Sequence, residues 1–183
     1  MRNVEFKAEL RDIVVARGVL HSLRAVHART FHQVDTYYRI PKGKLKKRET
    51  TGEETEYIFY ERPTQATPKV SSFTIFSPEH ARERFGKDPL PVWVTVRKER
   101  ELWLVAHTRV HLDTVENLGT FLEVESLVSR SNTLARAQAS ATELLKLLRP
   151  VLGELIDAGY ADMLARDQED GPGPPLLPPG RKR

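Results

Sequence analysis

The segment Leu118–Glu125 alternates between apolar and acidic residues as a β-strand does. Successive strand side chains point to opposite faces, so Glu123 and Glu125 share a face opposite Leu122. Two carboxylates on one face repel each other, and burying them together is costly unless cations lie nearby. This pattern is typical of a solvated outer face, and it also suits a pair of metal ligands inside a charged cavity.

Other predicted strands repeat this feature, with one charged face and one apolar face. The charged positions outside the opening segment are Glu5, Lys7, Lys44, Lys46, Arg48, Arg62, Lys98, Arg100, Arg109, His111 and Asp113. Amphipathic helices are available to cover the apolar faces. Together these features favour a sheet closed on itself, with a polar interior and helices packed outside.

The periodicity predicts eight strands and four helical segments. We expect strands over residues 3–10, 30–40, 44–50, 54–62, 70–76, 91–98, 102–112 and 118–128. Residues 91–98 and 102–112 are predicted to form a hairpin that turns near Arg97–Glu101. Helices are expected over residues 12–27 and 77–85, from a cap at Asn132 to Pro150, and over 151–158, with a last turn over 160–165. Residues 166–183 have the composition of a disordered tail, which leaves one domain over residues 1–165.

Composition restricts the classes of function. The chain has no cysteine, so any metal must be held by oxygen or histidine ligands. A net charge of +4 permits an anionic ligand, but the basic segment 42–48 lacks the interleaved aromatic residues that stack on nucleic-acid bases. No apolar run approaches the roughly 20 residues that cross a bilayer, and residues 1–7 leave no room for a signal-peptide core. We therefore expect a cytoplasmic monomer or homodimer with no membrane or nucleic-acid partner.

A cavity lined by both cations and carboxylates needs a ligand that satisfies both. A polyphosphate with bound divalent cations does so. Lysine and arginine form charge-assisted hydrogen bonds with phosphate oxygens. Carboxylates hold Mg²⁺ or Mn²⁺, which prefer oxygen ligands and bridge to phosphates.

Several motifs resemble one known family. Asn3-Val4-Glu5-Phe6-Lys7 resembles the N-terminal Glu-x-Glu-x-Lys motif of the CYTH superfamily, the triphosphate tunnel metalloenzymes. This group includes class IV (CyaB-type) adenylyl cyclases, thiamine triphosphatases and inorganic triphosphatases. The similarity continues in order through residues 33–38, 45–48, 60–63, 98–100, 109–113 and 118–125, and it covers roughly residues 1–165.

The resemblance implies an α+β fold, an antiparallel eight-stranded closed β-barrel with helices outside. It implies Mg²⁺ or Mn²⁺ as cofactor, with Glu5, Glu123, Glu125 and Asp113 as metal ligands. The triphosphate-binding residues it implies are Lys7, Lys46, Arg48, Arg62, Lys98, Arg100 and Arg109. Asn3 stands where the family has its first glutamate. An uncharged amide is expected to lower the occupancy of one metal, which leaves the number of metals open.

Two reactions fit such a site. One is hydrolysis of an organic or inorganic triphosphate, such as ATP, thiamine triphosphate or tripolyphosphate. The other is cyclisation of ATP to cyclic AMP and pyrophosphate. We favour hydrolysis because the sequence identifies no adenine pocket, although the N-terminal motif and chain length are closest to CyaB-type proteins. A non-catalytic polyphosphate- or nucleotide-binding module is a third hypothesis, supported by Asn3. No general base is identified, and His107 and His111 are interpreted as hydrogen-bonding residues rather than a metal pair.

Overall fold

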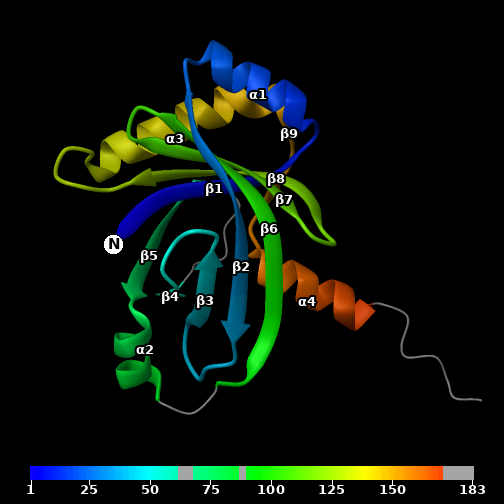
Figure 1. Ribbon diagram of the computed structural model, residues 1–183. Helices are drawn as coiled ribbons and strands as arrows, with labels where there is room; N and C mark the ends of the chain where they lie inside the picture. Colours follow the sequence, from blue (N-terminus) through cyan, green and yellow to red (C-terminus); the bar gives the residue numbers. More distant parts are fainter. Residues whose placement is uncertain (62–67, 87–89, 171–183) are drawn as a thin grey trace, which may run out of the picture.

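Eight antiparallel strands form a closed barrel in the computed structural model, which describes residues 1–61, 68–86 and 90–170 (Figure 1). The strands are β1 (Arg2–Leu10), β2 (Val26–Tyr38), β3 (Lys44–Thr50), β4 (Glu56–Glu61), β5 (Lys69–Phe76), β6 (Val92–Val105), β7 (Thr108–Val115) and β8 (Gly119–Leu127). They follow the order β5-β4-β3-β2-β6-β7-β8-β1, and pairing of β5 with β1 closes the sheet. The closed eight-stranded fold predicted above is confirmed.

A ninth strand, β9 (Leu152–Ile156), pairs with the C-terminal part of β1. The helix predicted over residues 151–158 is therefore wrong, and only the short 3₁₀ helix η1 (Arg149–Val151) precedes this strand. The register explains the difference. Strand β5 pairs with β1 only as far as Glu5, whereas β9 pairs with residues from Lys7 to Leu10. The backbone N–H and C=O groups at the C-terminal end of β1 thus form their hydrogen bonds with β9. Local periodicity in residues 151–158 does not reveal this requirement for a strand partner.

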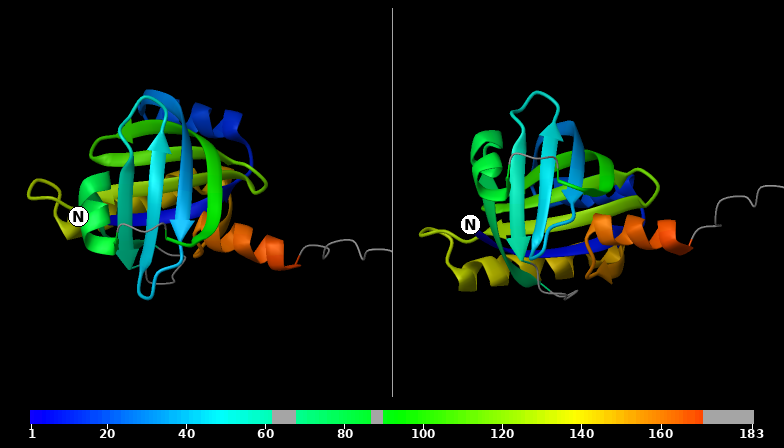
Figure 2. Two further views of the ribbon diagram at one scale, coloured as in Figure 1. Left: turned by 60° about the horizontal axis from the view of Figure 1, so that its bottom comes forward. Right: turned by 90° about the horizontal axis from the view of Figure 1, so that it is seen from below.

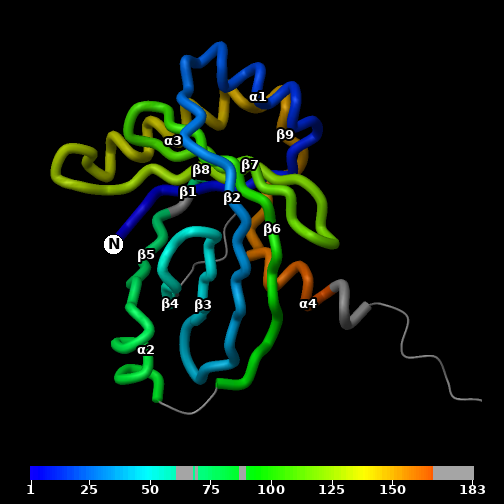
Figure 3. The backbone as a smooth tube through the Cα atoms, viewed as in Figure 1, coloured from blue at the N-terminus to red at the C-terminus, as the bar shows by residue number. Residues whose placement is uncertain are grey.

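Gly153 allows this close approach of β9 to β1. A Cβ atom at this position would lie 2.9–3.0 Å from the side chain of Glu9. Figure 3 shows how the chain then continues through β9 to the last helix, α4 (Tyr160–Asp170). Helix α4 extends five residues beyond the predicted domain boundary at residue 165, and residues 171–183 of the predicted tail lie outside the described residues.

The first helix, α1 (Ile13–Ser22), is shorter than predicted. Its start is as expected, because the Asp12 side chain accepts hydrogen bonds from the backbone N–H groups of Val14 and Val15 at 2.8 and 3.0 Å. The helix cannot reach residue 27, because Arg24 has a left-handed backbone conformation with φ of 57°. The next residues enter β2.

The remaining helices largely follow the prediction. Helix α2 (Pro78–Phe85) is capped by Ser77. Helix α3 (Leu134–Leu148) is capped by Thr133 rather than by Asn132. The Asn132 amide instead donates to the hydroxyl of Ser126 and the carbonyl of Leu127, at 3.2 and 2.8 Å, so it ties the helix start to β8.

Strand β6 is continuous, and the turn predicted near Arg97–Glu101 is wrong. These residues lie mid-strand, with partners on both β2 and β7. The turn follows instead at Ala106, whose φ is 49°. Inward Lys98 and Arg100 alternate with outward Arg97 and Glu99, so a run that resembles an exposed turn belongs to a strand with two charged faces.

The main apolar core lies outside the barrel wall. Phe6, Leu122 and Val124 face the helices and are essentially buried. Helix α3 covers them with Ala137, Ala141, Leu144 and Leu148. Figure 2 shows α3 lying along the outside of the sheet near β1 and β8. The apolar faces of these strands pack against the helices, so their polar faces line the barrel interior. Among the described helices, none is long and apolar enough to span a membrane.

Candidate functional site

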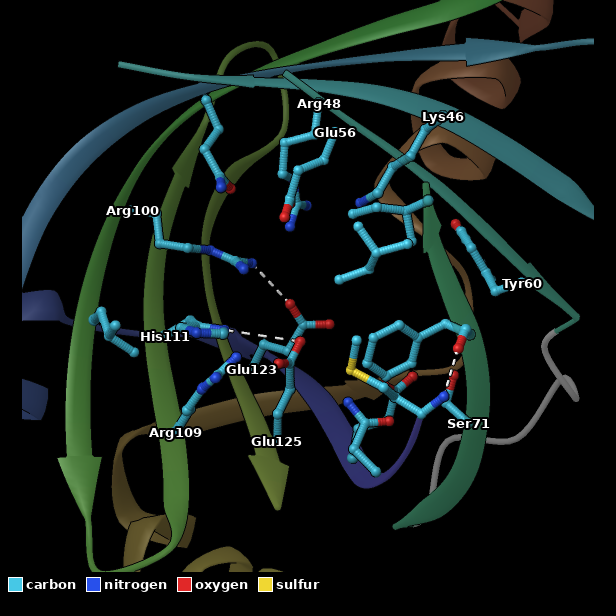
Figure 4. Close-up of a pocket in the computed structure, with 18 of the residues that line it drawn as sticks. Lys46, Arg48, Glu56, Tyr60, Ser71, Arg100, Arg109, His111, Glu123 and Glu125 are labelled. Atoms are coloured by element: carbon cyan, nitrogen blue, oxygen red, sulfur yellow. Dashed lines mark hydrogen bonds and ion pairs between the residues drawn. The ribbon is translucent and has the colours of Figure 1, made fainter. Parts of the chain in front are cut away.

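A cavity of about 680 Å³ occupies the barrel interior. Charged and amide side chains reach it from seven strands, β1 to β4 and β6 to β8, because alternate residues of each strand face inward. They include Asn3, Glu5, Lys7, Gln33, Lys46, Arg48, Glu56, Arg100, Arg109, His111, Glu123 and Glu125. In Figure 4, Lys46 and Arg48 of β3 lie across the cavity from Glu123 and Glu125 of β8.

The acidic side of the cavity is formed by β1 and β8. Glu5 is the direct cross-strand partner of Glu125. On the other side of β8, His111 pairs in register with Glu123. His111, Glu123 and Glu125 each offer one potential ligand atom, and these atoms all lie within 4.8 Å of one another. Three carboxylates and an imidazole are thus brought together by three adjacent strands.

Arg100 connects the cationic and acidic parts of the cavity. It donates to both oxygens of Asp113 at 2.6 Å and to Glu123 at 2.8 Å. Lys7 lies 3.6 Å from the other oxygen of Glu123, and its ammonium is 3.7 Å from the ring centroid of Tyr160. Glu123 is therefore held by two cations, which offset the repulsion between it and the other carboxylates.

Asp113 is not placed with the other predicted metal ligands. Its side chain is fully buried, and it accepts hydrogen bonds from Arg100 and from the hydroxyl of Tyr160 at 2.8 Å. Burial alone would raise the pKa of this carboxyl, but Arg100 and Lys98 lower the pKa below its usual range. Asp113 does not line the cavity. It is placed instead as a buried anion that holds Arg100 in position.

Asp35 performs the same task for the cations of β3, and sequence reasoning assigned it no role. It accepts two hydrogen bonds of 2.7 Å from Arg48 and one of 2.9 Å from Lys46, and Lys98 lies 3.6 Å away. Burial would raise its pKa, yet the three cations hold the pKa well below the usual value. The available signal was its place between Gln33 and Tyr37 on the inward face of β2.

The two buried lysines near Asp35 lose basicity. Burial, followed by the charge of Arg48, lowers the pKa of Lys46 from 10.5 to about 8. Burial, followed by the charge of Arg100, lowers the pKa of Lys98 to about 7. Of this pair, only Lys46 lines the cavity, while Lys98 lies behind it near Asp35 and Tyr160.

The predicted phosphate-binding set is thus only partly assembled at the cavity. Its members there are Lys7, Lys46, Arg48, Arg100 and Arg109. Lys98 lies behind the lining, and Arg62 falls outside the described residues. The arrangement places five of the seven predicted cations around a space that also faces Glu5, Glu123 and Glu125.

Tyr160, at the start of α4, is a second residue that sequence reasoning missed. Its ring contacts Lys7 and Phe121, and its hydroxyl donates to Asp113. Two residues later, Asp162 accepts hydrogen bonds of 2.6 Å from Lys44 of β3. The sequence predicted only a last turn here. Helix α4 instead brings an aromatic side chain to the cavity from a segment about 150 residues distant from Lys7.

His107 and His111 lie apart, so they form no metal pair. His107 lies exposed in the turn between β6 and β7, whereas His111 is 5% exposed and lines the cavity. Burial, followed by the charge of Arg100, lowers the pKa of His111 to about 4, so its imidazole is neutral at pH 7. The sequence interpretation of His111 as an inward-facing residue agrees with this position.

The donor set fits a divalent cation. Carboxylates supply the hard oxygen ligands that Mg²⁺ and Mn²⁺ prefer. Within the described part of the chain, Asn3 Oδ1 and His111 Nδ1 are buried and have no hydrogen-bond partner. Asn3 shares the inward face of β1 with Glu5. Buried polar atoms of this kind normally require a partner, and a bound cation would provide one.

A sequence model of the CYTH domain matches residues 1–160. Among proteins with curated functions, none matches the chain. The PH1012 protein of Pyrococcus horikoshii has a similar structure, with 19% identity, a TM-score of 0.70, and coverage of 87% of this chain and 98% of that protein. A candidate adenylate cyclase of Vibrio parahaemolyticus has 17% identity and a TM-score of 0.65, with 89% and 97% coverage. The Hippeastrum protein HpAC1, a candidate adenylyl cyclase with a dominant triphosphatase activity, has 15% identity and a TM-score of 0.60, with 91% and 96% coverage.

Proposed function

Because the chain belongs to the CYTH family, we propose that it is a divalent-metal-dependent enzyme that hydrolyses a triphosphate inside the barrel. The observation that carries this proposal is the facing arrangement of cations and carboxylates around one cavity of about 680 Å³. A polyphosphate with its metal ions is the ligand that satisfies both kinds of charge.

The cations are positioned before any substrate arrives. Asp35 holds Lys46 and Arg48 at 2.7–2.9 Å, and Asp113 holds Arg100 at 2.6 Å. Such fixed charges stabilise developing negative charge without reorganising during the reaction. We therefore assign Lys46, Arg48 and Arg100 to orienting the phosphate chain, with Lys7 and Arg109 as further contacts.

Glu5, Glu123 and Glu125 are proposed to hold Mg²⁺ or Mn²⁺. When bound, such an ion neutralises phosphate charge and polarises the phosphorus–oxygen bonds. Phosphoryl transfer requires mainly positioning and charge neutralisation, which this lining supplies. Hydrolysis would then proceed by attack of a water molecule on the terminal phosphorus. The bond from that phosphorus to its bridging oxygen breaks, and orthophosphate, the remaining diphosphate and a proton are released.

Cyclisation of ATP is the second candidate. It is favoured by the apolar side chains Phe31, Leu102 and Leu104, which line the same cavity and can accept the organic part of a nucleotide. Cyclisation additionally requires the ribose 3′-hydroxyl to be fixed opposite the α-phosphorus. Hydrolysis makes no such demand, so it remains our first proposal.

A substrate panel separates these functions. Tripolyphosphate, thiamine triphosphate and ATP should each be incubated with Mg²⁺ and Mn²⁺, while phosphate, pyrophosphate and cyclic AMP are measured. Phosphate release from a triphosphate supports hydrolysis, and cyclic AMP with stoichiometric pyrophosphate would establish the cyclase instead. Tight binding of tripolyphosphate without turnover would indicate a non-catalytic binding module.

The double variant Glu123→Gln, Glu125→Gln tests the metal assignment. Its metal-dependent activity should fall at least about 100-fold, the scale of losing a charge-stabilising group in a catalytic site. The matched control, Glu116→Gln with Glu154→Gln, alters two exposed carboxylates and should keep full activity. Circular dichroism checks that both proteins are folded. Full activity in the first variant would show that these carboxylates do not hold an essential metal.

A further inference from the structure

We infer that His111 is a further protein ligand of the metal site, so that one imidazole joins the carboxylates of Glu123 and Glu125. The inference rests on the proposed function only in using the same two carboxylates. Its consequence is a preference for Mn²⁺ and later transition metals over Mg²⁺. This selectivity distinguishes the site from one built of carboxylates alone.

The three side chains converge through the register of β7 and β8. His111 lies directly opposite Glu123, and Glu125 is the diagonal neighbour on the same face. The potential ligand atoms of all three lie within 4.8 Å of one another. Figure 4 shows the His111 ring facing Glu125 across the acidic side of the cavity.

The spacing between His111 and Glu125 suits a shared ion better than a direct bond. His111 Nδ1 lies 3.9 Å from Glu125 Oε1, beyond the range of a hydrogen bond. Metal–nitrogen and metal–oxygen bonds of about 2.1 Å allow two ligands of one cation to lie up to about 4.2 Å apart. The observed separation falls within that span.

Within the described ranges of the chain, the imidazole nitrogen that faces the carboxylates accepts or donates no hydrogen bond. His111 is 5% exposed, and its Nδ1 is buried without a hydrogen bond among the described residues. Arg100, the nearby cation, directs its hydrogen bonds to Asp113 and Glu123. A buried polar atom without a partner is unfavourable, and a cation between the three side chains would satisfy it.

A nitrogen ligand changes which metal the site prefers. Mg²⁺ favours oxygen ligands and keeps several of its waters, whereas imidazole suits transition metals. At a given site of mixed nitrogen and oxygen ligands, affinity rises from Mn²⁺ through Co²⁺ to Ni²⁺. His111 would therefore shift selectivity away from Mg²⁺, while Glu5 and Asn3 place oxygen atoms on the same cavity from the neighbouring strand.

Pulsed electron paramagnetic resonance of bound Mn²⁺ tests the inference without substrate. Electron spin-echo envelope modulation of the full-length protein should show coupling to an imidazole ¹⁴N nucleus. Protein labelled with ¹⁵N in its histidines should lose this pattern and show the ¹⁵N pattern. The labelling arm needs no substitution, so the test stands even if a variant folds poorly.

The variant His111→Gln should lose the nitrogen coupling and bind Mn²⁺ at least about tenfold more weakly, the scale of disturbing a ligand or its support. Mg²⁺ affinity should change less. The control His107→Gln alters the exposed turn histidine and should keep the coupling. Bound Mn²⁺ without nitrogen coupling in the wild-type protein would overturn the inference, as would coupling that survives in His111→Gln. Phosphate release that depends on Glu123 and Glu125 would still support the proposed function in either case.

Discussion

Arg100 donates hydrogen bonds to both carboxylate oxygens of Asp113 at 2.6 Å, and it donates a third to Glu123 at 2.8 Å. One guanidinium thus connects Asp113, which lies behind the cavity lining, to Glu123, which faces the cavity. The strength of this buried pair determines how firmly the cavity's central cation is held. It therefore yields the first testable prediction.

Asp113→Asn should lower the free energy of unfolding by about 3–5 kcal/mol, because it leaves buried Arg100 with only part of its counter-charge. Urea denaturation measures the change. Glu99→Gln, on the outward face of the same strand as Arg100, is the control and should change stability by less than about 0.5 kcal/mol. If Asp113→Asn were fully stable and instead lost one bound metal ion, Asp113 would be a ligand after all.

Tyr160→Phe should lower the free energy of unfolding by about 1.5–3 kcal/mol, the usual contribution of a hydrogen bond to a charged group. The substitution removes the hydroxyl that donates to Asp113 at 2.8 Å but keeps the ring over Lys7. Tyr160→Ala should cost more, since it also removes the contact with Phe121. Thermal unfolding of the three proteins tests the order. Equal stability of wild type and Tyr160→Phe would contradict a structural role for this bond.

Lys98 should make stability increase with pH above about 7. Its pKa is lowered from 10.5 to about 7 in the folded protein, mainly by burial. Between these values the unfolded chain binds more protons at this residue, so raising the pH favours the folded state by up to about 1.4 kcal/mol per pH unit. The stabilisation gained from Lys98 is complete above pH 10.5, the pKa of the unfolded chain. It is lost as the pH falls to about 7, the pKa of Lys98 in the folded protein.

The variant Lys98→Met removes that proton-binding difference. The free energy of unfolding, measured in urea at pH 7.5 and 9.5, should therefore rise more with pH in the wild type than in the variant. If the free energy of unfolding changed equally with pH in both proteins, Lys98 would keep its ordinary pKa in the folded state.

Lys46 should make tripolyphosphate binding weaken as the pH rises through about 8. At that point the ammonium loses its proton, because burial and Arg48 lower its pKa to about 8. Binding should weaken by about tenfold between pH 7 and 9.5, where most of the lysine is neutral. Lys46→Arg keeps the charge over this range and should flatten the profile. Calorimetric titration at fixed Mg²⁺ provides the measurement, and identical profiles would remove Lys46 from the binding set.

Asn3→Glu should tighten Mg²⁺ binding by roughly tenfold, equivalent to about 1.4 kcal/mol. The new carboxylate would join Glu5 on the inward face of β1, where Asn3 Oδ1 has no hydrogen-bond partner among the described residues. Without metal, the same variant should be less stable because like charges are brought together. Melting temperatures in Mg²⁺ and in a chelator separate the two effects, with Asn3→Gln as the neutral control. An unchanged affinity would mean that the amide already serves as well as a carboxylate.

Two errors in the sequence interpretation have the same origin. The run Arg97–Glu101 resembled a turn because both of its faces are charged, and residues 151–158 resembled a helix because their apolar spacing permits one. In each case the decisive contact is with a strand distant in sequence: β2 and β7 for the first, and β1 for the second. The local pattern of apolar residues does not indicate which distant strands will pair with a segment.

The sequence by itself determined which faces of the strands are charged, and therefore that a closed barrel would enclose cations and carboxylates. Alternation with period 2 is a local property, so Glu5, Lys46, Arg100 and Glu123 could be assigned to inward faces from the sequence. Only the tertiary structure decided which opposite charges meet. Asp35 and Asp113 became buried supports, Tyr160 arrived from α4, and His111 was brought beside Glu125, because each contact depends on strand register and barrel closure rather than on neighbouring residues.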